Sequence, residues 1–66
     1  MPRKRMAIRV KRLREAQGMT QETLAKKAGL SRGYLARLET ARQDPTLSTL
    51  EKLARALRLK PSELID

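Results

Sequence analysis

The spacing of the apolar residues constrains the fold of this sequence more than any other feature. Apolar residues recur at intervals of three and four in short segments, and the strict alternation of a half-buried strand does not occur. The clearest series consists of Leu47, Leu50, Leu53, Ala54 and Leu57. Because this period places side chains on one face of an α-helix, the sequence predicts an all-α fold.

Glycine, proline and hydroxyl residues divide the chain into five predicted helices. Gly18 and Gly29 are suited to end the first two helices, because glycine adopts the left-handed backbone of a C-cap without strain. Thr20 and Ser31 are expected to cap the second and third helices at their N-termini. Pro61 suits the first turn of a short last helix.

The length and the composition of the N-terminus set the expected domain organisation. The chain has 66 residues, which is enough for one domain. Residues 1–5 are basic, contain a proline and offer no apolar anchor, so we expect a flexible arm there. Residues 6–66 are expected to form the single folded domain.

The composition argues against an enzyme. The chain has no cysteine and no histidine, so it lacks thiolate ligands, disulfides and the most common general base. Its seven carboxylates are scattered and its three glycines are isolated, so neither a catalytic pair nor a phosphate loop is indicated. We expect no catalytic residues, no metal, no cofactor and no small-molecule ligand.

The net charge indicates a polyanionic partner. Sixteen Lys and Arg residues oppose seven Asp and Glu residues, giving a formal charge of +9. Because Tyr34 is the one aromatic residue, stacking on single-stranded bases is disfavoured, and double-stranded DNA is the expected partner. No apolar run approaches the ~18 residues of a membrane span, and the N-terminus lacks a signal-peptide pattern. We therefore expect a cytoplasmic, nucleoid-associated protein that does not bind membranes.

Residues 21–38 form the motif that most favours duplex DNA. Two short helical patterns are joined at Gly29, and Ala25 is small where the two helix axes must approach. The outer face of the second helix is expected to consist of Arg32, Gly33, Ala36 and Arg37. This face presents charge and little bulk, as entry into a major groove ~12 Å wide requires. A plain helical hairpin with solvated arginines is the alternative that the spacing leaves open.

Several short patterns occur in a fixed order along the chain. They are Leu13-Arg14 before Gly18, Thr20-Gln21, Leu24-Ala25, Gly29-Leu30-Ser31-Arg32, Leu38-Glu39, Pro45 ahead of Leu47 and Leu50, and Leu53-Ala54-Arg55-Ala56-Leu57. In this order, from about Met6 to Ile65, they resemble the phage-repressor and Cro-like helix-turn-helix regulators, often called XRE-type. The resemblance implies a compact five-helix lambda-repressor-like bundle that contains a helix-turn-helix.

The resemblance, together with the exposed helix face and the basic arm, implies roles for individual residues. Those expected to contact base edges are Ser31, Arg32, Gly33, Ala36 and Arg37. Those expected to contact the DNA backbone are Gln21, Tyr34, Thr40 and Arg42, with Arg3, Lys4 and Arg5 of the arm. Arg14 and Glu39 match a structural pair that links the first and third helices of the family.

Two positions depart from the pattern of the family in a way that affects the backbone. Thr40-Ala41 stands where the family often has Asn-Gly, so the loop after the third helix is expected to differ in shape. Arg58 replaces the glycine that commonly closes the fourth helix. A third feature is Gly33 in the first turn of the third helix, where glycine costs local helicity. It either allows the backbone to approach the DNA closely or makes no base contact.

The predicted function is that of a sequence-specific DNA-binding transcriptional regulator, most simply a repressor. One short helix contacts too few base pairs for useful specificity, so we expect a homodimer on a palindromic operator. The expected apolar contacts of the dimer are Leu59, Leu64 and Ile65. The alternatives are an antitoxin or a restriction-modification controller of the same fold, and a basic module that binds another protein.

Overall fold

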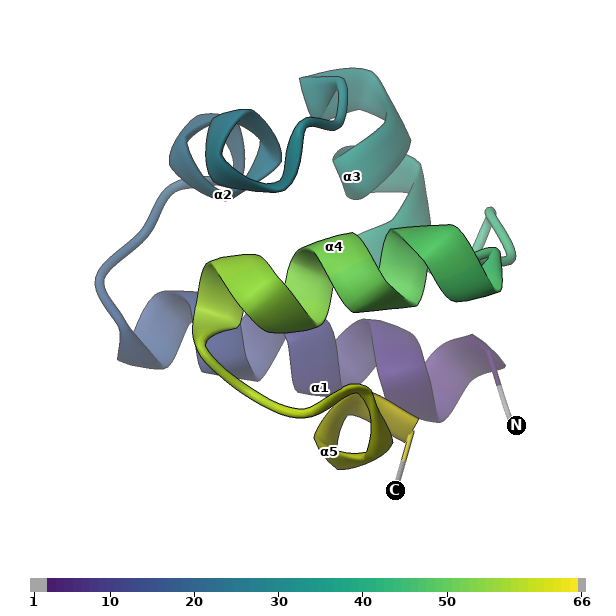
Figure 1. Ribbon diagram of the computed structural model, residues 1–66. Coiled ribbons are helices and arrows are strands. Elements are labelled where there is room, and N and C mark those ends of the chain that lie inside the picture. The colour runs from purple at the N-terminus through teal and green to yellow at the C-terminus, as the bar shows by residue number, and fades with distance from the viewer. Residues whose placement is uncertain (1–2, 66) are drawn as a thin grey trace.

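Five helices follow one another with short connections in the computed structural model, which describes residues 3–65 except the side chain of Ile65 (Figure 1). They are α1 (Arg3–Ala16), α2 (Gln21–Ala28), α3 (Arg32–Glu39), α4 (Leu47–Leu57) and α5 (Pro61–Ile65). Residues 3–65 contain no strand, so the predicted all-α, five-helix fold is confirmed. None of these helices combines the length and the apolar character needed to cross a membrane.

The helix α4 lies at the centre of the arrangement. It packs against α2 and α5, while α1 packs against α3 and α5. In Figure 1, α2 and α3 lie above α4, and α1 and α5 lie below it. All five helices contribute to one core, whose fully buried large side chains are Met6, Val10, Leu24, Leu35, Leu38, Leu53, Leu57 and Leu64.

The apolar series of α4 is confirmed at four of its five positions. Leu50, Leu53, Ala54 and Leu57 are buried, whereas Leu47 in the first turn is 69% exposed. Leu47 is the first residue of α4 and therefore lies at the edge of the core, outside its packed interior.

The proposed dimer contacts on the last segment need correction. Leu64 is fully buried and Leu59 is partly buried against the core, so Leu64 is not available to a second chain. A helix of five residues is unstable alone, so α5 depends on an apolar anchor in the core. The side chain of Ile65, the third expected contact, lies outside the described residues.

Hydroxyl side chains begin three of the helices in the same way. The hydroxyl oxygens of Thr20, Ser31 and Thr46 each accept a hydrogen bond from the backbone N–H three residues later, at 3.0–3.1 Å. The caps predicted at Thr20 and Ser31 are therefore confirmed, and Thr46 is a third. Each cap satisfies a backbone donor that the first turn of a helix leaves unpaired.

Residues 3–5 of the expected arm form the first turn of α1. Arg3 is held by contacts that are distant in sequence: its Nε lies 2.8 Å from Asp44 Oδ1, and its Nη1 donates to the carbonyl oxygen of Ala41 at 3.4 Å. These contacts stabilise the first turn of α1, which consists of polar residues. Met1 and Pro2 lie outside the described residues.

Two residues other than glycine adopt the left-handed backbone conformation. Ala41, after α3, and Arg58, the C-cap of α4, both have a φ of +61°. These are the two positions at which the chain departs from the glycine of the family pattern. For a residue with a Cβ, this conformation costs roughly 1–2 kcal/mol, so the loop and the cap keep their shape at the expense of stability.

We expect an Arg58→Gly variant to be more stable than an Arg58→Ala variant by about 1 kcal/mol, because both remove the charge but only glycine relieves the backbone. The free energies of unfolding from denaturant titrations give the comparison. Ala41→Gly should likewise raise the free energy of unfolding, because glycine adopts the left-handed conformation at position 41 without strain. Equal stability of the two Arg58 variants would show that the C-cap of α4 is not strained.

Candidate nucleic-acid interface

The pair α2–α3 is held at a fixed angle by a short turn and a shared apolar interior. Gly29 ends α2 with a φ of +70°, and the N–H of Leu30 donates to the carbonyl oxygen of Ala25 at 2.8 Å. The buried side chains between these helices and the core are Leu24, Ala25, Ala28, Leu35 and Leu38. With one side of α3 buried in this way, the opposite side faces outward.

The outward side of α3 brings together the residues predicted to contact bases. Ser31, Arg32, Gly33 and Arg37 are exposed, and Ala36 is half-buried. A Cβ at Gly33 would lie 3.5 Å from Nη1 of Arg37, so the guanidinium of Arg37 lies along the helix towards its first turn. The donors of Arg37 are thereby directed to the end of α3 at which Arg32 stands.

Ser31 has a structural task besides any contact with a base. Its hydroxyl oxygen accepts the N–H of Tyr34 at 3.0 Å and so begins α3. The hydroxyl can still donate its own proton outward. The helix that presents the arginines therefore depends on the same side chain that was predicted to contact DNA.

Three of the residues predicted to contact the DNA backbone are engaged inside the protein. Tyr34 Oη donates to Thr49 Oγ1 at 3.3 Å, and Thr40 Oγ1 donates to the carbonyl oxygen of Ala36 at 3.1 Å. Gln21 Nε2 donates to Glu39 Oε1 at 3.0 Å. A hydroxyl has one proton and a side-chain amide has two, so only Gln21 keeps a second donor while these contacts persist.

The basic residues of the expected arm do not form one group. Arg3 contacts the loop that follows α3, as described above, whereas Lys4 and Arg5 line a groove between α1 and α5. Arg42, in the loop after α3, is exposed. The structure therefore brings Arg3 and Arg42 to the side of α3 and leaves Lys4 and Arg5 along α1.

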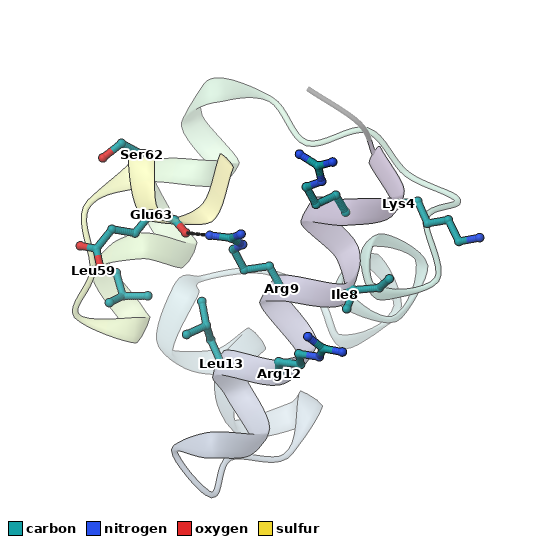
Figure 2. Close-up of a pocket in the computed structure, with 9 residues that line it drawn as sticks. Lys4, Ile8, Arg9, Arg12, Leu13, Leu59, Ser62 and Glu63 are labelled. Atoms are coloured by element: carbon teal, nitrogen blue, oxygen red, sulfur yellow. Dashed lines mark hydrogen bonds between the residues drawn. The ribbon is translucent and has the colours of Figure 1, made fainter. Parts of the chain in front are cut away.

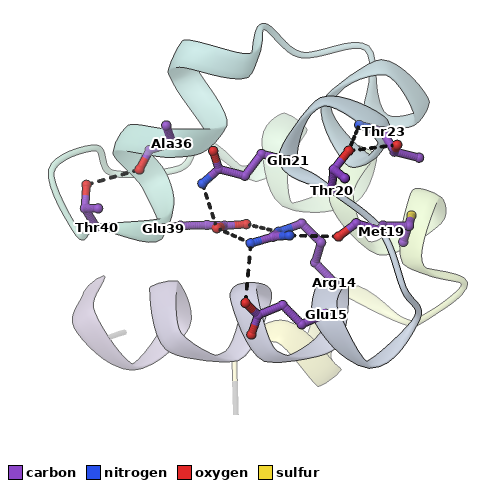
Figure 3. A network of polar contacts seen from close by, with 9 residues as sticks. All are labelled: Arg14, Glu15, Met19, Thr20, Gln21, Thr23, Ala36, Glu39 and Thr40. Atoms are coloured by element: carbon purple, nitrogen blue, oxygen red, sulfur yellow. Dashed lines mark hydrogen bonds and ion pairs between the residues drawn. The ribbon is translucent and has the colours of Figure 1, made fainter.

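A buried polar network connects α3 to the rest of the fold (Figure 3). Arg14 binds Glu39 through two contacts, Nε to Oε2 at 2.7 Å and Nη2 to Oε1 at 3.0 Å. Its Nη1 donates to the carbonyl oxygen of Met19 at 2.8 Å. The side chains of Arg14 and Glu39 are only 9% and 2% exposed. The structure thus places the two residues of the expected pair in direct bidentate contact.

The electrostatics of this network favour the charged form of Arg14. The hydrogen bonds that Arg14 donates to the carboxylate of Glu39 raise the pKa of Arg14 above its ordinary value, and they outweigh the burial that acts in the opposite direction. No three histidine, cysteine or carboxylate side chains gather as a metal site within the described part of the chain. The contacts of Arg14 with Glu39 form an ion pair that joins α1 to α3.

Thr49 is a residue of this region that the sequence analysis missed. It is buried, its N–H donates to Thr46 Oγ1, and its own hydroxyl lies 3.0 Å from that oxygen. It also accepts the hydroxyl of Tyr34, so it connects α3 to α4. The signal was the repeated pattern Thr-x-x-Thr, which begins at the N-cap and ends in the first turn of both α2 (Thr20, Thr23) and α4 (Thr46, Thr49).

The geometry of α2 and α3 defines a helix-turn-helix, in which the second helix offers an exposed basic face. Residues 10–64 match the family model described as "Helix-turn-helix". The chain is 47% identical over 57 residues to the immunity repressor protein of Bacillus phage phi105, covering 86% of this chain and 40% of the repressor. The chain therefore spans less than half of that relative's length.

Solved structures agree with the sequence comparison. The restriction-modification controller protein C.AhdI from Aeromonas hydrophila matches with a TM-score of 0.92 and 39% identity, over 94% of each chain. SinR, a master regulator for biofilm formation solved in complex with DNA, matches with a TM-score of 0.88 and 32% identity, over 92% of this chain and 98% of that one. The chain belongs to the helix-turn-helix family, as a DNA-binding regulator of the phage-repressor and Cro-like type.

We expect Glu39→Ala to lower the free energy of unfolding by about 3 kcal/mol, because it leaves the buried guanidinium of Arg14 without its carboxylate. Glu15→Ala is the matched control. Glu15 is a more exposed carboxylate 4.0 Å from the same guanidinium, and its loss should cost less than about 0.5 kcal/mol. Urea titrations measure both values, and a similar small loss for the two variants would contradict a structural role of the buried pair.

Proposed function

We propose that this protein binds a specific duplex operator with α3 in the major groove and represses transcription by excluding polymerase from the promoter. The observation that carries the proposal is the outward face of α3. It presents Arg32 and Arg37, with the small residues Gly33 and Ala36 on the same face, on a helix whose other side is fixed in the core. Small residues between the arginines allow the backbone to approach the bases closely.

The base contacts follow from the chemistry of the two arginines. The guanidinium group has donors in a planar fork that matches O6 and N7 of guanine, so we assign a guanine in each half-site to Arg32 or Arg37. Because the Arg37 guanidinium lies back over Gly33, both forks are near the first turn of α3. We therefore expect the two contacted base pairs to be close together, with the methyl group of Ala36 available to a thymine methyl.

The phosphate contacts are assigned by counting donors. A phosphate accepts hydrogen bonds, and the one proton of Tyr34 and that of Thr40 are already donated within the protein. Gln21 keeps a second amide proton and lies in the first turn of α2, where unpaired backbone N–H groups favour anions. We therefore assign the stronger backbone contacts to Gln21 and to the exposed Arg42.

The operator is expected to be palindromic. A helix of eight residues contacts only a few base pairs, which is too little to select one site among the many that a genome offers. Two copies related by a two-fold axis would place their α3 helices in half-sites about 34 Å apart. We propose that the protein binds as a homodimer.

A role as a restriction-modification controller is the second candidate. It is supported by the match to C.AhdI, in which the similarity extends over 94% of each chain. Both roles use the same contacts with DNA and differ in the genes beside the operator. Selection of binding sites from random duplex DNA, followed by their location in the genome, separates the two roles.

We expect Arg32→Ala and Arg37→Ala each to weaken binding to the selected operator by about 1–3 kcal/mol and to relax the preference at one base pair. Arg55→Ala, which removes an exposed arginine from α4, is the matched control and should keep the preference unchanged. Binding to a panel of single-base operator variants measures the effect. A uniform loss across the panel would place these arginines on phosphates instead.

The affinity for DNA should fall steeply with salt. If five or six cations neutralise phosphates, log K is expected to fall against log salt concentration with a slope of about −5. Arg42→Ala should reduce the slope by about 1, because one phosphate contact is lost. Titrations between low and moderate salt give the slope, and a flat response would contradict binding of a duplex through a basic face and favour a module that binds protein.

A further inference from the structure

A groove between α1 and α5 lies apart from the contacts with DNA assigned to Gln21, α3 and Arg42 (Figure 2). It encloses about 890 Å³, and its apolar lining consists of Ile8, Leu13 and Leu59. Ile8 is 44% exposed, and Leu13 and Leu59 are partly buried against the core. The groove therefore offers a concave apolar surface on a helix that is otherwise strongly basic.

The position of Ile8 on α1 explains why this surface is left open. Met6 and Val10 are fully buried, and Ile8 lies two residues from each, on the opposite side of the helix. The core of the domain therefore does not need Ile8. A single exposed apolar side chain is ordinary, but Ile8 lines the same groove as the partly buried Leu13 and Leu59, and concave apolar surfaces are typical of binding sites.

The charges around the groove are mostly positive. Lys4, Arg5, Arg9 and Arg12 line it on the side of α1, and Glu63 supplies the one carboxylate among the described residues of the lining. That carboxylate accepts the N–H of Lys60 at 3.0 Å at the start of α5. Arg9 donates to the backbone carbonyl oxygen of Glu63 at 3.1 Å rather than to its carboxylate. Lys4, Arg9 and Arg12 therefore give the described part of the rim an excess of positive charge, without any contribution from Arg5.

The groove is separate from the face of α3. In Figure 1, α1 and α5 lie below α4, and α2 and α3 lie above it. On α1, the side that carries Arg14 faces Glu39 of α3, whereas Arg12 lies two residues away, on the other side of the helix. A ligand in the groove would therefore leave the outward face of α3 accessible.

We propose that this groove binds an acidic amphipathic helix of a partner protein. Apolar side chains of the partner would fill the space between α1 and α5, and its carboxylates would meet the lysine and arginines of the rim. A second copy of this chain does not fit, because two such faces would oppose cation to cation. A duplex does not fit either, since its phosphates offer nothing to the recessed apolar floor.

The probe for this proposal is a synthetic amphipathic peptide with leucines at positions i, i+4 and i+7 and glutamates elsewhere, labelled for fluorescence anisotropy. Arg12→Glu should weaken its binding at least about tenfold, because a cation of the rim becomes a like charge. Lys11→Glu is the matched control: it makes the same charge change on the same helix, at an exposed residue outside the groove lining, and should change binding little.

Two further measurements test the apolar part and the independence from DNA. Ile8 is half-exposed, so Ile8→Ser should leave the fold intact. The variant should bind the leucine peptide more weakly than the unchanged protein does. For a peptide in which serine replaces leucine, the same variant should lose little further affinity. The peptide should also bind the complex of protein and duplex DNA. This outcome does not depend on the proposed operator contacts, because any duplex that the protein binds serves.

Four results would overturn the proposal. They are no binding of the acidic peptide, equal losses from Arg12→Glu and Lys11→Glu, displacement of the peptide by duplex DNA, and loss of self-association in Ile8→Ser by sedimentation. The second would mean that only the overall charge of +9 acts. The third would assign the groove to a nucleic acid, and the fourth would assign it to a second copy of the chain.

Discussion

The bidentate contact between Arg14 and Glu39 is the interaction on which the presentation of α3 depends. Apolar packing is not directional, so leucines alone would allow α3 several orientations on the core. A buried guanidinium and a buried carboxylate permit few orientations of α3, because the fold loses several kcal/mol of stability when either charge is buried without its partner. Through Gln21 and the carbonyl of Met19 the same pair fixes the start of α2 as well.

The helix α1 serves two sides of the molecule. Its inner side supplies Met6, Val10 and Arg14, which hold the core and orient α3. Its outer side supplies Ile8 and Arg12, which these contacts do not require. Because the two sets alternate along one helix, a change on the outer side can alter what the surface binds while the helix-turn-helix keeps its geometry.

The sequence allowed the prediction of elements set by local rules, and it failed where distant residues decide. The period of apolar residues and the caps at Thr20 and Ser31 are local, and they were correct. The order of Arg3 depends on Asp44, and no local pattern reveals that contact. Leu64 belongs to a helix of five residues, which is too short for periodicity to show which side is buried. The contact of Arg14 with Glu39 was expected only through the resemblance to a family, while its coupling to Gln21 was not expected.

Tyr34 gives the molecule an optical property that follows from its place at the junction of α3 and α4. It is the one aromatic residue of the chain, it is partly buried against the core, and its hydroxyl donates to Thr49. The near-ultraviolet dichroism and the intrinsic fluorescence of the protein therefore report on this junction alone. They can reveal loosening of α3 while far-ultraviolet dichroism still shows intact helices elsewhere.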